Sequence, residues 1–220
     1  MEIININDFN NKKIKDSDVI RRVIGGEKEL FEVLIRRNNQ KLYRVIRTYL
    51  KNEAEIEDVM QNSYLKAYIK LYQFKLQASF STWLIRIGIN EALARINEKS
   101  KVQHINDQLD NNHVIHIQDY KNSNPYDKMI EREMKHTLEA AIDKLEVKYR
   151  EVYILKEIEE MSIKEVAEAL DITVANVKVR IHRAKEMLKE NLYSLSNDKN
   201  VFEFGFSRCD RITEYVMSHI

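Results

Sequence analysis

The scarcity of turn-forming residues constrains the fold of this chain more than any other feature of its sequence. Its 220 residues include only 4 glycines and 1 proline, whereas average usage would supply roughly 26. Sandwiches, barrels and propellers need tight turns every few residues, and glycine and proline provide many of them. An apolar content of 44% is still enough to bury a core. We therefore predict an all-α protein.

Charge and cysteine usage exclude several classes of protein. With 36 basic and 35 acidic residues the net charge is +1, so a surface that binds nucleic acid must be local. The single cysteine, Cys209, excludes an intramolecular disulfide and a zinc-finger spacing. No apolar run approaches 18 residues, and the first 20 residues lack a signal-peptide core. We expect no membrane insertion and a cytoplasmic location.

The periodicity of apolar residues divides the chain into two helical domains. After a polar lead-in and the Gly25-Gly26 break, apolar residues recur at steps of three and four, which is typical of packed amphipathic helices. The fourth of these helices is predicted from about Ser81 to Glu98. Periodicity lapses in a polar linker and resumes at Asn124-Pro125, a typical helix start. The predicted segments are a lead-in (1–22), a first domain (23–98), a linker (99–124), a second domain (125–192) and an extension (193–220).

A helix-turn-helix is the strongest local signal. Ser162 and Glu165 have the spacing of a capping box. The short helix that they begin is followed by a three-residue turn, Asp171 to Thr173, in which Asp171 takes the place of the usual glycine and tolerates the left-handed conformation. Thr173 is a good N-cap for the next helix. Two short helices joined in this way form a DNA-binding unit.

The second helix of this unit separates into two faces. At about 100° per residue, its apolar residues form a buried face that consists of Val174, Val177, Ile181, Ala184 and Leu188. The opposite face is predicted to meet base edges through Ala175, Asn176, Val179 and Arg183, with Lys178, Arg180 and Lys185 better placed for phosphates. The alternative is a solvated basic helix without a ligand.

Two further groups of residues lie in the first domain. The fourth helix is apolar nearly all round except for a stripe of Arg86, Asn90 and Asn97. Such a stripe suits an edge of nucleic acid, although a solvent face would have the same spacing. Aromatic residues around the preceding loop could stack an unpaired base or belong to the core. The acidic segment that contains Glu57, Asp58 and Gln61 suits either docking on a basic partner or helix capping.

These segments together resemble one family. Residues 56–61 and 80–92 are similar to region 2 of the sigma-70 family, and residues 149–155 and 177–184 are similar to region 4. The short linker between them resembles that of an extracytoplasmic-function (ECF) sigma factor. The resemblance implies that the chain binds bacterial core RNA polymerase, directs it to promoter DNA and is inhibited by an anti-sigma factor.

The resemblance also implies residue roles. Glu57, Asp58 and Gln61 would bind the clamp helices of the polymerase β′ subunit. The loop and fourth helix would capture a flipped base and contact the minus-ten element through Phe74, Phe80, Ser81, Thr82, Trp83, Arg86, Asn90 and Asn97. The minus-thirty-five element would be read by Ala175, Asn176, Lys178, Val179, Arg180, Arg183 and Lys185.

Other classes of protein remain as alternatives at this point. The sequence has no phosphate-binding glycine loop, no HExxH and no nucleophile elbow, so we expect no catalytic residue, cofactor or metal. The linker histidines 104, 113 and 116 are expected to be solvated. A helix-turn-helix regulator that binds duplex DNA without polymerase is the main rival, and a helical adaptor that binds only protein is another.

Overall fold

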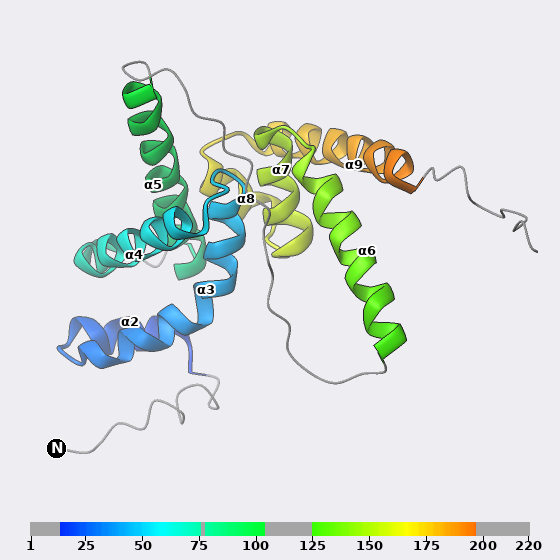
Figure 1. Cartoon of the computed structure of the whole chain (residues 1–220). Coiled ribbons are helices and arrows are strands. Elements are labelled where there is room, and N and C mark those ends of the chain that lie inside the picture. Colours follow the sequence, from blue (N-terminus) through cyan, green and yellow to red (C-terminus); the bar gives the residue numbers. More distant parts are fainter. Residues whose placement is uncertain (1–13, 76–77, 104–124, 197–220) are drawn as a thin grey trace, which may run out of the picture. The chain divides into compact units, whose positions relative to one another are not determined.

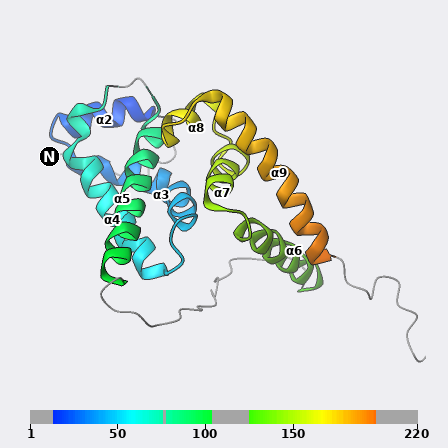
Figure 2. The same ribbon diagram turned by 90° about the horizontal axis from the view of Figure 1, so that it is seen from above.

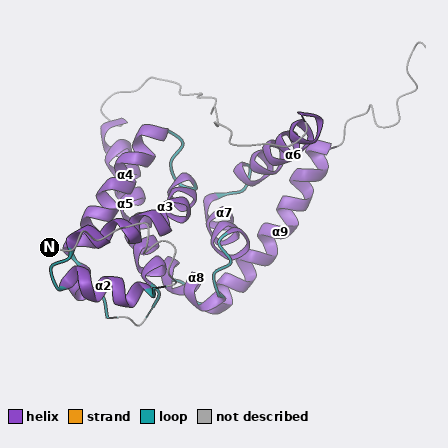
Figure 3. Cartoon of the chain, turned by 90° about the horizontal axis from the view of Figure 1, so that it is seen from below, coloured by secondary structure: helices purple, strands orange, loops and turns teal. Residues whose placement is uncertain are grey.

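A computed structural model describes residues 14–75, 78–103 and 125–196. Within these ranges every element is a helix or a loop (Figures 1 and 3), which confirms the all-α prediction. The described residues fall into two compact units: residues 14–103 with 145–185, and residues 125–144 with 186–196. The linker histidines, Cys209 and most of the predicted extension lie outside the described residues. None of the described helices is long and apolar enough to cross a membrane.

The first unit is built around three long helices, α3 (Phe31–Arg47), α4 (Glu53–Ile69) and α5 (Phe80–Gln103), which pack against one another (Figure 2). Most of the apolar residues that recur at steps of three and four between residues 30 and 50 belong to one helix, α3. Asn52 caps α4 by accepting a hydrogen bond from the Glu55 amide. Helix α5 continues five residues beyond its predicted end at Glu98.

The predicted lead-in contains a helix that the sequence analysis missed. Helix α2 (Asp16–Ile24) buries Val19, Ile20 and Val23 in the same core as α3. The signal is short, because the apolar residues of the helix all lie between Val19 and Ile24. The predicted break at the two glycines is confirmed, since Gly25 ends α2 and Gly26 has a φ of 109°.

Residues 145–185 complete the first unit. Helix α7 (Val147–Tyr153) continues into a π-helical turn, η3 (Ile154–Ile158), and is followed by α8 (Ile163–Leu170) and the start of α9 (Val174–Ser196). Val152, Leu155 and Val166 belong to one apolar cluster with residues of α3 and α5. Part of the predicted second domain therefore packs within the first compact unit.

The second unit contains α6 (Pro125–Asp143) and the C-terminal part of α9. Pro125 is the first helical residue, as its sequence position predicts. The Asn191 side chain in α9 donates to the Ala141 carbonyl in α6 at 3.1 Å, so this hydrogen bond joins the two helices.

Candidate polymerase and nucleic-acid interfaces

The helix-turn-helix forms as predicted. Ser162 and Glu165 make both hydrogen bonds of the capping box at the start of α8. Hydrogen bonds from Ser162 hold the pKa of the Glu165 carboxyl below its usual value, with Lys41 and Thr82 adding to the effect. Asp171 takes the left-handed conformation with φ 56°. The Thr173 hydroxyl then accepts from the Asn176 amide at 3.2 Å, so α9 begins at the predicted N-cap.

The exposed face of α9 is the one that the helical angles predicted. Ala175, Asn176, Lys178, Val179, Arg183 and Lys185 are exposed. Val177, Ala184 and Leu188 are buried. The prediction that Val174 is buried was wrong, because this residue is 41% exposed. It lies in the first turn, before α9 reaches the apolar cluster.

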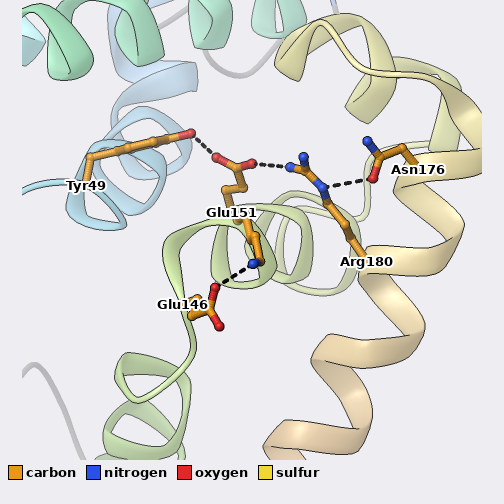
Figure 4. Close-up of polar contacts among 6 residues, drawn as sticks. Tyr49, Glu146, Glu151, Asn176 and Arg180 are labelled. Atoms are coloured by element: carbon orange, nitrogen blue, oxygen red, sulfur yellow. Dashed lines mark hydrogen bonds and ion pairs between the residues drawn. The ribbon is translucent and has the colours of Figure 1, made fainter.

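Arg180 is held inside the protein rather than extended into solvent. Its Nη1 donates to Oε1 of Glu151 in α7 at 2.9 Å, and its Nε donates to Oδ1 of Asn176 at 3.0 Å (Figure 4). Its side chain is only 23% exposed. A residue that was predicted to bind phosphate therefore has a carboxylate partner in this structure.

The Glu151 carboxylate also accepts a hydrogen bond from a residue of the first domain. The Tyr49 hydroxyl, which lies just after α3, donates to Oε2 of Glu151 (Figure 4). Burial raises the pKa of the Glu151 carboxyl, whereas the Tyr49 hydrogen bond and the Arg180 charge lower it. The sequence analysis missed both residues, because they lie 102 positions apart and no local pattern connects them.

The polar stripe of α5 is exposed as predicted. Arg86, Asn90 and Asn97 are all exposed. Up to Ala92 the other residues of α5 are buried or half-buried, whereas several residues beyond it, Leu93 and Ala94 among them, are exposed as well. Nη2 of Arg86 lies 3.5 Å from Oδ2 of Asp171 in the helix-turn-helix turn. The stripe can therefore offer one guanidinium and two amides to a ligand.

The aromatic residues before α5 form one cluster. Ring centroids lie 5.2 Å apart for Phe74 and Trp83, and 5.9 Å apart for Phe80 and Trp83. Phe74 and Trp83 are partly exposed, but Phe80 is 2% and Thr82 is 1% exposed. Phe80 packs in the core and Thr82 shares a hydrogen bond with Ser79, so these two side chains lie beneath the exposed rings. Ser81 is half-buried.

The acidic segment of α4 faces solvent. Glu57, Asp58 and Gln61 are exposed, and they follow the first turn, whose acids are Glu53 and Glu55. Because Asn52 already caps the helix, these three residues are not needed for capping. Glu57 and Gln61 border an open, mainly apolar groove that is lined by Phe31, Ile35, Asn39, Met60, Tyr64, Leu65 and Tyr68.

A capped helix-turn-helix with an exposed basic helix, together with this acidic edge and groove, defines a DNA-binding protein that also has a surface for a protein partner. Comparisons with known proteins identify its family. Residues 34–102 match the family model for sigma-70 region 2, and residues 135–188 match that for sigma-70 region 4.

Similar proteins of known name belong to the same family. The chain is 32% identical over 179 residues to the ECF RNA polymerase sigma factor SigW of Bacillus subtilis, covering 80% of this chain and 96% of that protein. It is 29% identical to the ECF sigma-E factor of Haemophilus influenzae, with 84% and 98% covered. The fold resembles RpoE of Bartonella quintana, solved with the anti-sigma factor NepR, at a TM-score of 0.61 and 20% identity over 74% of this chain and 96% of that one.

The chain belongs to the ECF group of the sigma-70 family of RNA polymerase sigma factors. It is therefore a transcription initiation factor that binds core RNA polymerase and directs it to promoters. The regulator that acts without polymerase is the less well supported alternative, since both family regions occur in one chain in the expected order.

Proposed function

We propose that three surfaces of this sigma factor divide the work of initiation. The edge of α4 formed by Glu57, Asp58 and Gln61 docks on the clamp helices of the polymerase β′ subunit. The α5 stripe and its aromatic loop engage the minus-ten element, and the exposed face of α9 reads the minus-thirty-five element. Residues 23–98 and 125–192 are the corresponding domains, and residues 99–124 join them.

The α4 edge is the observation that carries the proposal. Two carboxylates and an amide on one exposed helix suit a basic partner helix. The apolar groove beside them would bury side chains of that helix. A regulator that binds duplex DNA alone has no use for this combination.

Within the minus-ten surface the residues have different tasks. Arg86, Asn90 and Asn97 are the exposed polar groups that could bond to nucleic acid. Phe74 and Trp83 offer partly exposed rings for stacking a base. Phe80, Thr82 and the half-buried Ser81 shape the loop from beneath. The factor supplies recognition and strand capture, while the chemistry of RNA synthesis stays with the polymerase.

An anti-sigma factor is the regulator that we propose, and the cytoplasm is the compartment. The fold is similar to CnrH, solved with the cytosolic domain of CnrY, at a TM-score of 0.54 and 24% identity over 80% of this chain and 96% of that one. Co-purification from native cells in which only polymerase is recovered under every growth condition would count against such a partner.

Reconstituted run-off transcription tests the proposed function. Core polymerase, this protein and a library of promoter fragments from the source genome should yield discrete transcripts. At limiting protein concentration Asp58→Lys should strongly reduce them, whereas Glu133→Lys, an equal charge reversal at an exposed position on α6 outside the three proposed surfaces, should not. Absence of any transcript with the wild-type protein, without an inhibitor present, would refute the assignment.

A further inference from the structure

The second unit has an apolar surface that its two helices do not cover. Helices α6 and α9 contact each other (Figure 2), and Ala141, Ile142 and Leu188 are buried. Met134 on α6 and Tyr193 on α9 are nevertheless 68% and 69% exposed. Stable helical units pack elements in layers around a core, and within the described residues this unit has no third helix. The unit therefore lacks a covering layer on this side.

An open groove lies between α6 and α9 at this place. It is lined by one residue of α6 and five of α9: Thr137, Glu186, Lys189, Glu190, Leu192 and Tyr193. Its volume of about 810 Å³ lies in the range of pockets that enclose a drug-sized ligand, so it can take several aromatic side chains. Along α9 the lining extends from Glu186 to Tyr193, which is about 10 Å at a rise of about 1.5 Å per residue.

The sequence that follows α9 carries three aromatic residues at alternate positions. Helix α9 ends at Ser196, and the sequence continues to Ile220. Phe202, Phe204 and Phe206 lie in this continuation. Alternate residues of an extended segment point to the same side, so the three rings would share one face over about 13 Å. This length is close to that of the groove.

The separation along the chain allows these residues to return to the groove. Phe202 follows Ser196 by six positions, which can span up to about 20 Å. The middle of the groove lies near Lys189, about 10 Å back along α9. A segment on so short a tether has an effective concentration in the millimolar range. It therefore outcompetes a second copy of the chain at micromolar concentration.

We propose that residues 202–206 occupy the groove between α6 and α9 and complete the second unit, with the phenylalanine rings against Leu192 and Tyr193. Burial of aromatic rings is the driving force, since these side chains remove large apolar areas from water. The docked segment holds α6 against the C-terminal half of α9, whose N-terminal half carries the proposed recognition face. The proposal does not depend on what that face binds.

Thiol accessibility in the full-length protein tests this docking. Lys189→Cys places a reporter in the groove, and Lys135→Cys places a matched reporter on α6 outside its lining; both positions are exposed. A Cys209→Ser background removes the one natural cysteine. A bulky maleimide should modify the Lys189→Cys reporter about tenfold more slowly when the phenylalanines are present than when all three are replaced by serine. A millimolar effective concentration acting on a contact of about 0.1 mM affinity leaves about one tenth of the molecules open.

The Lys135→Cys reporter should react at the same rate in both chains. Equal rates for Lys189→Cys, or the same change at both reporters, would overturn the proposal. So would protection that grows with protein concentration, because a second copy of the chain would then occupy the groove.

Hydrogen exchange gives a second readout in a chain whose groove is unaltered. Backbone amides of α6 should exchange faster when Phe202, Phe204 and Phe206 are replaced by serine, because the unit loses its covering segment and opens more often. Amides of α4 in the first unit should exchange at the wild-type rate, which shows that the variant is folded. Unchanged exchange in α6 would mean that the segment does not complete the unit, and the proposal would fail.

Discussion

Gly88 allows α5 to approach α3 closely. Its replacement by alanine should lower the free energy of unfolding in the wild-type background and raise it in a background with more room. A Cβ atom added at Gly88 would lie 2.6 Å from Cδ1 of Leu42 and 3.6 Å from Cδ1 of Ile46. Carbon atoms prefer a separation of about 3.5–4.0 Å. Leu42 is completely buried, so its side chain has little room to rotate away.

Two opposing contributions set the magnitude for Gly88→Ala. Alanine is favoured over glycine inside a helix by about 0.8–1.0 kcal/mol. Overpacking a tight core costs about 1–3 kcal/mol. The net result is a loss of up to about 2 kcal/mol in the free energy of unfolding, measured by urea denaturation with circular dichroism.

The Leu42→Val background removes the clashing atom, because valine has no Cδ. In that background Gly88→Ala should stabilise the protein by about 1 kcal/mol, since only the helix preference remains. The coupling in this double-mutant cycle is therefore about 1–3 kcal/mol. If Gly88→Ala has the same effect in both backgrounds, close packing between α3 and α5 does not explain the glycine.

Three other expectations concern the surfaces and the capping box. Asp58→Lys should weaken binding to core polymerase about 10- to 100-fold without changing the thermal melt, and unchanged affinity in a pull-down titration would reject the docking role. Asn176→Ala should relax sequence preference at one or two base pairs, at a cost of about 1–3 kcal/mol in binding free energy. Lys178→Ala should weaken binding to all duplexes and reduce the slope of log affinity against log salt concentration by about one. The opposite pattern in anisotropy titrations would mean that α9 faces the groove differently. Glu165 has a lowered pKa in the folded state, so its stabilisation is present above its unfolded pKa of about 4.5 and is lost as the pH falls through the folded pKa. The stability difference between Glu165→Gln and wild type should accordingly shrink on going from pH 7 to pH 3, and a constant difference would contradict it.

Local signals predicted the parts of this molecule that depend on local interactions. The capping box, the left-handed turn residue and the exposed face of α9 all follow from residues within one or two turns of one another. The predicted burial of Val174 was wrong, because helical angles give the face on which a residue lies but not where the neighbouring elements end. Helix α2 was missed because four apolar residues in nine, all in its last two turns, give a short periodic signal.

Contacts between distant segments could not be predicted in the same way. Tyr49 and Glu151 are ordinary residues in their own helical patterns, and only the fold brings the hydroxyl to the carboxylate. The burial of Phe80 and Thr82 depends likewise on how α5 packs against α3 and α4. The sequence predicted aromatic rings beside a polar stripe, but which of these rings face solvent depends on how the helices pack.

The position of Glu151 determines what Arg180 can bind. Arg180 pairs with this carboxylate in the structure, and a guanidinium can make similar charge-assisted hydrogen bonds with a phosphate. Glu151 therefore competes with a DNA phosphate for Arg180. Glu151→Gln removes the competing charge and keeps the side-chain shape, so it should strengthen the binding of α9 to duplex DNA of any sequence in anisotropy titrations, and an unchanged or weaker affinity would contradict this role of Glu151.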